Sequence, residues 1–137
     1  HYPPIPAAVY PRCLRSAPHE DINFITLLPA ATTSGLQLKD RDGSWLNVDG
    51  EAGTLIVDVG DMLARLTNDV LPSTTHQVVN TEEGRIKSRF SMPFFMHPQS
   101  DVDLSCLPSC RGQGEKYASV TAGDFLMQRL REIGLIK

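Results

Sequence analysis

Short apolar runs alternate with turn-forming residues along most of the chain. These runs occupy residues 22–28, 35–38, 54–59, 76–79 and 86–95, and polar or glycine-containing segments separate them. Between residues 39 and 46 the pair Asp42-Gly43 predicts the tight turn of a β-hairpin. The polar segment 80–84 predicts another turn, between the last two runs. Many short strands with turns between them favour a β-sandwich or barrel over a parallel sheet.

Two segments have helical character. Residues 61–67 predict a short helix, and a longer one is expected at the C-terminus, where Thr121 and Asp124 have the spacing of a capping box. Leu126, Leu130 and Ile133 then share one helical face. The first eighteen residues contain five prolines (Pro3, Pro4, Pro6, Pro11 and Pro18), which predict an irregular segment or a sheet edge. We therefore expect a mostly β fold with a C-terminal helix.

Composition narrows the class of protein. The 137 residues suit one domain, and the net charge of −3 gives no reason to expect nucleic acid or an anionic membrane as partner. No apolar run is long enough to cross a bilayer. Cys13, Cys106 and Cys110 are an odd number, which argues against a disulfide framework and favours plain thiols in a reduced, cytoplasmic protein.

The triplet His19-Glu20-Asp21 contains two metal-binding side chain types. In an extended strand His19 and Asp21 share a face, with Glu20 on the other. An imidazole beside a carboxylate suits a divalent transition metal, and His76, at the start of a predicted strand, could complete a two-histidine, one-carboxylate face. A His-x-Asp triplet alone is more often an ordinary surface strand.

The segment Arg89-Phe90-Ser91 repeats the same two-residue spacing. If the segment is a strand, Arg89 and Ser91 share a face and Phe90 points the other way into apolar packing. A guanidinium binds a carboxylate through two charge-assisted hydrogen bonds, and a neighbouring hydroxyl can add a third. This pair suits the far carboxylate of a dicarboxylic acid that chelates a metal. Taken alone, it also fits a surface ion pair beside a solvated serine.

The order His19-x-Asp21, His76, Arg89-x-Ser91 resembles the iron(II)- and 2-oxoglutarate-dependent dioxygenases, specifically the isopenicillin N synthase-like branch. Further ordered matches support the resemblance: Tyr2-Pro3-Pro4, Gly35-Leu36-Gln37-Leu38 with Asp42-Gly43-Ser44-Trp45, Val59-Gly60-Asp61, Thr67-Asn68, Ser73 to Asn80, Arg89 to Phe95, and Arg129-Leu130-Arg131.

The resemblance implies a double-stranded β-helix (jelly roll) over residues 1–137, with Fe(II) held by His19, Asp21 and His76. It implies that 2-oxoglutarate chelates the iron and pairs with Arg89 and Ser91, and Tyr2 matches a family tyrosine near this co-substrate. The implied activity uses O2 and couples oxidative decarboxylation of 2-oxoglutarate to succinate with hydroxylation or a related oxidation of a small organic substrate. The protein would position the reactants, and the metal centre would supply the oxidising power.

The resemblance leaves several alternatives open. Family members carry a helical region before the jelly roll, and the present chain lacks a match to it. We therefore expect an exposed apolar face through which copies could associate, and a truncated, inactive metal-binding domain is one alternative. Others are an isopenicillin N synthase-like or ethylene-forming-type oxidase that does not use 2-oxoglutarate, and a metal-free jelly-roll binding module. The substrate-contacting segments of the family are variable, so the sequence does not identify the prime substrate.

Overall fold

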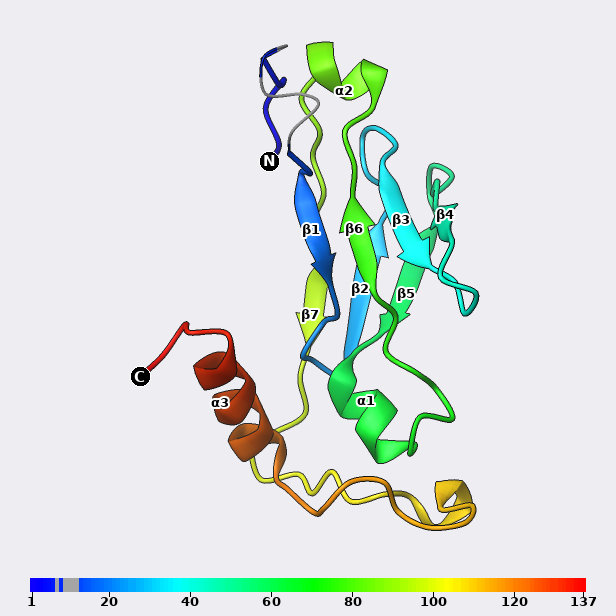
Figure 1. Ribbon diagram of the computed structural model, residues 1–137, viewed down its shortest axis with the longest axis vertical. Helices are drawn as coiled ribbons and strands as arrows, with labels where there is room; N and C mark the ends of the chain where they lie inside the picture. Colours follow the sequence, from blue (N-terminus) through cyan, green and yellow to red (C-terminus); the bar gives the residue numbers. More distant parts are fainter. Residues whose placement is uncertain (7, 9–12) are drawn as a thin grey trace. The chain divides into compact units, whose positions relative to one another are not determined.

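The computed structural model describes residues 1–6, 8 and 13–137 (Figure 1). Pro11, one of the five prolines of the expected irregular segment, lies outside these residues. The chain divides into two compact units. The first comprises His1–Glu20, Leu27–Val57 and Thr74–Phe94, and the second comprises Asp21–Thr26, Asp58–Ser73 and Phe95–Lys137.

The first unit contains a four-stranded antiparallel sheet. Its strands follow the order β1 (Ser16–His19), β6 (His76–Val78), β3 (Leu36–Lys39) and β4 (Trp45–Asn47). The hairpin from β3 to β4 confirms the turn predicted at Asp42-Gly43. Gly43 has a φ of 87°, a left-handed conformation that glycine adopts without strain.

Strand β1 forms one edge of this sheet, and it contains Pro18. Proline has no N–H to give to a ladder, so an edge strand is where it is tolerated. The pairing of β1 with β6 is antiparallel and places His19 directly opposite His76. Sheet register therefore brings together two histidines that are far apart in the sequence.

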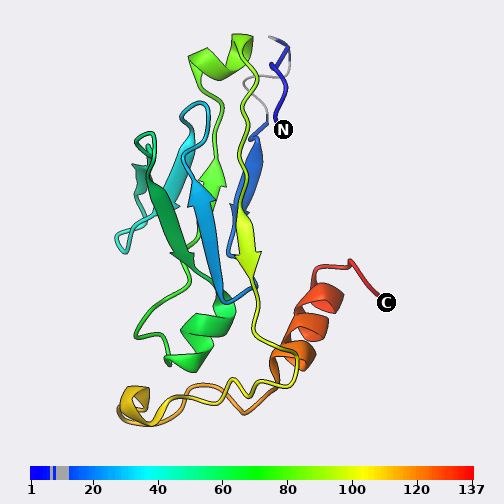
Figure 2. The ribbon, with the colours of Figure 1, turned by 180° about the vertical axis from the view of Figure 1, so that it is seen from behind.

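A three-stranded sheet has β2 (Ile25–Pro29) between β5 (Leu55–Val59) and β7 (Phe94–Met96), as Figure 2 shows from behind. The run 22–28 becomes a strand only from Ile25, because residues 22–24 form a bend. In this bend the side-chain amide of Asn23 donates a hydrogen bond to the Ile25 backbone oxygen over 2.9 Å. With its two sheets, the chain is mostly β.

The prediction of a continuous strand over 86–95 was wrong. Ile86 ends helix α2 (Glu82–Ile86), which also replaces the turn expected at 80–84. The side chain of Thr81 accepts a hydrogen bond from the backbone N–H of Gly84, and two glutamates in the first turn favour a helix start. Pro93 cannot donate to a ladder, and β7 begins only after it, at Phe94.

The second unit contains α1 (Asp61–Leu66), the 3₁₀ turn η1 (Pro108–Cys110) and α3 (Ala122–Glu132). The short helix was expected at 61–67, and α3 lies where the C-terminal helix was expected, with Thr121 accepting from the Asp124 N–H. The apolar core of the second unit consists of Met62, Leu104, Ala122 and Phe125, and Ile22, Phe24, Val120 and Leu126 pack against it.

Two general expectations can be compared with the described residues. Cys13, Cys106 and Cys110 are free thiols, as the cysteine count predicted. Within residues 1–6, 8 and 13–137, none of the helices has both the length and the apolar character needed to cross a bilayer.

Candidate metal centre

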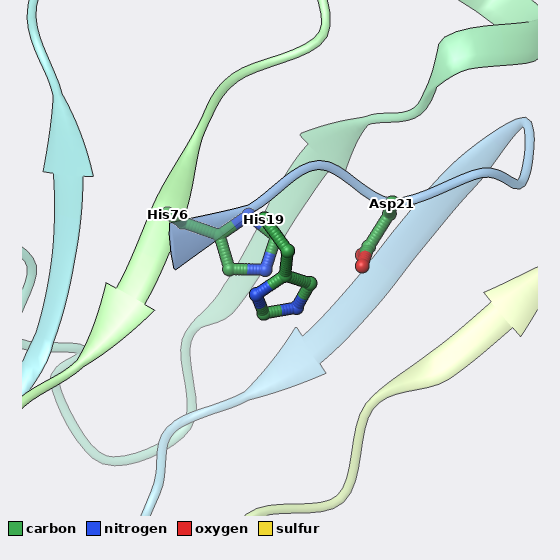
Figure 3. A group of neighbouring side chains, drawn as sticks. All are labelled: His19, Asp21 and His76. Carbon is green, nitrogen blue, oxygen red and sulfur yellow. The ribbon is translucent and has the colours of Figure 1, made fainter. Parts of the chain in front are cut away.

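His19, Asp21 and His76 each present one potential ligand atom, and these three atoms all lie within 4.8 Å of one another. Figure 3 shows the two imidazole rings next to each other, with the Asp21 carboxylate beside them. The ring centroids of the two histidines are 4.3 Å apart. The structure thus brings together the three residues that the sequence proposed as a metal site.

The positions of these residues follow from the strands. His19 is the last residue of β1 and His76 is the first of β6, so their side chains lie across one antiparallel pair. Asp21 lies beyond the end of β1 rather than inside a longer strand, which corrects the expected extended triplet. Glu20 is exposed and accepts a hydrogen bond from the Thr75 hydroxyl over 2.7 Å.

Both imidazole rings are oriented by backbone oxygens two residues earlier. Nδ1 of His19 lies 2.8 Å from the oxygen of Ala17, and Nδ1 of His76 lies 3.1 Å from that of Thr74. A neutral ring that donates its Nδ1–H in this way has its lone pair on Nε2. Metal-ligating histidines typically donate the second ring N–H to such a partner, which fixes the ring and its tautomer.

The donor set fits a first-row divalent metal. Imidazole nitrogen and carboxylate oxygen lie about 2.0–2.2 Å from ions of this kind, so two donors of one ion are at most about 4.4 Å apart. The observed limit of 4.8 Å needs only a small side-chain adjustment to meet this condition. Two histidines and one carboxylate leave coordination positions for other ligands, which is typical of non-haem Fe(II) oxygenases.

The buried carboxylate of Asp21 has a partner that the sequence analysis missed. The hydroxyl of Thr26 donates to Oδ2 of Asp21 over 2.5 Å. The amide of Asn23 in turn donates to the Thr26 hydroxyl over 3.0 Å. The available signal was weak: two polar residues in an otherwise apolar run.

The structure places Arg89 next to Tyr2. The two residues exchange both backbone hydrogen bonds, each 2.8 Å long, and the Arg89 guanidinium carbon lies 5.5 Å from the centre of the Tyr2 ring. Arg89 is 2% exposed. Burial lowers the pKa of its guanidinium below the usual value, although an arginine at neutral pH remains charged.

One nitrogen of this buried guanidinium stands out. Nε of Arg89 donates to the backbone oxygen of Thr33 over 3.2 Å, whereas Nη1 has no hydrogen-bond partner in the part of the chain that the structure describes. Arg89 also lines a cavity of about 270 Å³ in the first unit, whose apolar lining includes Leu28, Leu36, Val48 and Ile56. A buried, incompletely satisfied charge at a cavity is suited to binding an anion.

The other two residues of the predicted co-substrate strand depart from the expected geometry. Ser91 is half-buried in the irregular stretch before β7. Phe90, expected in apolar packing, is 51% exposed and stacks on the ring of His1, with the centroids 4.6 Å apart. Without a regular strand, the two-residue spacing does not by itself put Arg89 and Ser91 on a common face.

A mostly β fold that carries a cluster of two histidines and one carboxylate is typical of the non-haem iron oxygenases. A family model described as the 2OG-Fe(II) oxygenase superfamily matches residues 1–98. The 2-oxoglutarate-Fe(II) type oxidoreductase hxnY of Emericella nidulans is 37% identical over 130 residues, which cover 92% of this chain and 36% of that protein.

Solved structures give the same result. A 2OG-Fe(II) oxygenase family protein from Caulobacter crescentus is 47% identical with a TM-score of 0.83, covering 96% of this chain and 43% of that one. A full-length Neurospora crassa protein, solved in complex with alpha-KG, is 30% identical with a TM-score of 0.85, covering 96% and 42%. The chain belongs to the 2OG-Fe(II) oxygenase superfamily. It spans about a third of the length of the curated relatives it matches.

Proposed function

We propose that this chain forms the catalytic part of an Fe(II)- and 2-oxoglutarate-dependent dioxygenase that oxidises a small organic substrate. The observation that carries the proposal is the convergence of the His19, Asp21 and His76 donor atoms within 4.8 Å. His19 and His76 would bind the metal through Nε2, because their Nδ1 atoms face backbone oxygens, and Asp21 would bind it through its carboxylate. When bound, the metal would supply the oxidative decarboxylation of 2-oxoglutarate by O2 to succinate and CO2, coupled to hydroxylation or a related oxidation of the substrate.

Arg89 supports the use of a dicarboxylic co-substrate. Its buried Nη1 has no partner among the described residues, and a carboxylate would supply one. The apolar side chains lining the same cavity suit the methylene groups of a short dicarboxylic acid. Asp49 also borders the cavity, but this carboxylate is exposed and solvent screens its repulsion of an anion.

Tyr2 and Ser91 complete the proposed co-substrate site. The Tyr2 ring is held against Arg89 by backbone pairing, which keeps a phenol beside the guanidinium. Ser91, two residues beyond Arg89, would add a hydroxyl donor to the same carboxylate. We further propose that the two sheets belong to a double-stranded β-helix of the isopenicillin N synthase-like branch.

The co-substrate assignment is tested by titrating the anaerobic Fe(II) protein with 2-oxoglutarate while following the visible absorption of the metal chelate. Arg89→Leu should weaken binding by roughly 30-fold to several-thousand-fold, because losing one side of a buried charge pair costs about 2–5 kcal/mol. Arg89→Lys should recover only part of the affinity, since an ammonium lacks the two-bond fork. Arg85→Leu is the matched control, because Arg85 is exposed and pairs with Glu82 on the surface.

The outcome separates the proposed dioxygenase from its nearest rival. If Arg89→Leu binds 2-oxoglutarate as tightly as the wild-type chain, Arg89 does not bind the co-substrate. A wild-type chain that binds Fe(II) but shows no chelate absorption with 2-oxoglutarate would instead favour an oxidase that does not use this acid.

Two further expectations stay predictions. Phe94 and Met96 share one face of β7 and are 63% and 39% exposed, which supports self-association through an apolar face. Sedimentation as a monomer at all concentrations would count against it. Location in the cytoplasm is the other, and fractionation of cells that produce the protein would test it.

A further inference from the structure

The Asp21 carboxylate is held by a short chain of buried hydrogen bonds within the second unit. Thr26 donates to Oδ2 of Asp21 over 2.5 Å, a length typical of a charge-assisted O–H···O⁻ bond. The Thr26 oxygen itself accepts from the Asn23 amide over 3.0 Å. The other acceptor near the Thr26 hydroxyl, Oδ1 of Asn23, lies 3.4 Å away, so the nearer and charged carboxylate is the stronger acceptor of the hydroxyl hydrogen.

Asn23 is fixed in place by the start of α1. It is only 2% exposed, and its side-chain amide also donates to the Ile25 backbone oxygen over 2.9 Å. The backbone oxygen of Asn23 accepts a hydrogen bond from the N–H of Met62 over 3.1 Å. The backbone oxygen of Asp21 accepts one from the N–H of Asp61 over 2.8 Å. Asp21 and the bend that follows it are therefore held against the first turn of α1 by two backbone hydrogen bonds, one at Asp21 and one at Asn23.

Gly60 makes this attachment possible. A Cβ at position 60 would lie 2.1 Å from the backbone oxygen of Asn23 and 2.6 Å from its side-chain oxygen. Only a residue without a side chain allows the two backbones to approach so closely. The N–H of Gly60 also donates to the oxygen of Phe24 over 3.0 Å, so three successive amides, from positions 60 to 62, bind the bend.

We infer that Thr26 is a positioning residue for the metal centre: its hydroxyl fixes the rotation of the Asp21 carboxylate and favours metal binding through a single carboxylate oxygen. This inference rests on the proposed function, since it requires a metal at His19, Asp21 and His76. Hydrogen-bond partners of metal ligands typically contribute 10- to 100-fold to affinity. A freely rotating carboxylate would have to lose that freedom when the metal binds.

The test is titration of the chain with Co(II), followed by its d–d absorption spectrum. Thr26→Val keeps the branched shape but removes the hydroxyl, and it should weaken Co(II) binding by about 10- to 100-fold and change the spectrum. Thr26→Ala removes the same hydroxyl and should do likewise, so the test survives if one variant fails to fold. Thr26→Ser keeps the hydroxyl and should restore affinity to within about threefold of the wild-type chain.

A matched control separates positioning from general destabilisation. Thr67 is a buried threonine of the same unit whose hydroxyl donates to the Leu63 backbone oxygen over 2.8 Å. Thr67→Val should lower the thermal stability and leave the Co(II) affinity and spectrum unchanged. Unchanged Co(II) affinity and spectrum in the folded Thr26→Val or Thr26→Ala chain would overturn the inference.

The same titration tests the metal centre and the role of Thr26 separately. A wild-type chain that does not bind Co(II) contradicts both the metal centre and the role of Thr26. If the wild-type chain binds Co(II) and the Thr26 variants bind it equally well, only the role of Thr26 falls. If the Thr26 variants weaken binding but the chain never converts 2-oxoglutarate, the inference stands and the proposed reaction falls.

Discussion

Replacing Gly60 by alanine should destabilise the chain strongly. The added Cβ would meet the Asn23 backbone oxygen at 2.1 Å, whereas ordinary contacts of a Cβ begin at about 3.4 Å. One of the two backbones must therefore move by more than about 1 Å. The φ of Gly60 is −90°, an ordinary value, so the cost comes from the clash and not from the backbone conformation.

The expected magnitude follows from the contacts that would be lost. Overpacking at a tight contact costs about 1–3 kcal/mol, and a buried backbone group left without its partner costs about as much again. The movement would stretch the hydrogen bonds from Gly60, Asp61 and Met62, so we expect a loss of about 3–5 kcal/mol. For a chain of this size that corresponds to a Tm lower by roughly 10–20 °C.

Thermal and urea unfolding measure this effect, and Gly84→Ala provides the control. The nearest atom to a Cβ at Gly84 is Nη2 of Arg15 at 3.1 Å, the end of a flexible side chain, and Gly84 lies in α2. Its substitution should change stability by less than about 1 kcal/mol. A Gly60→Ala chain with the Tm of the wild type would refute the close approach between Gly60 and the bend that carries Asp21.

Two further predictions concern the second unit. Thr121→Ala should destabilise the chain by about 1 kcal/mol, because Thr121 caps α3, and Thr121→Ser should restore most of the loss in urea unfolding. Hydrogen bonds from Ser105 and Ser119 lower the pKa of Asp103, so its contribution to stability is present above about pH 4 and is lost as the pH falls through the folded-state pKa. Asp103→Asn should remove that part of the pH dependence, and an unchanged Tm profile between about pH 2 and 5 would contradict the assignment.

Local chemistry made parts of the fold predictable from the sequence. The Asp42-Gly43 turn requires a residue tolerant of positive φ, and glycine supplies it. The candidate metal ligands His19, Asp21 and His76 could be proposed from residue type together with the ordered family resemblance, because a His-x-Asp triplet alone is more often a surface strand. Their convergence depends on the register that pairs His19 with His76, and register is a property of the assembled sheet.

The wrong prediction of a strand over residues 86–95 has a local cause. The apolar content of 86–95 suggested a strand, but the cap at Thr81 and the proline at position 93 decided the local structure. The role of Thr26 could not be predicted, because it depends on the tertiary structure and not on the local sequence. A threonine in a strand is an ordinary β-forming residue, and only the tertiary contact with Asp21 gives its hydroxyl a role.

The most direct test of the proposed function is to incubate the Fe(II)-loaded chain with 2-oxoglutarate and O2 and to quantify succinate by NMR. The account predicts Fe(II)-dependent formation of one succinate for each 2-oxoglutarate consumed, and loss of this activity in His76→Ala. Stoichiometric Fe(II) binding without any succinate, in the presence of a broad panel of small organic substrates, would contradict it and favour an inactive metal-binding domain.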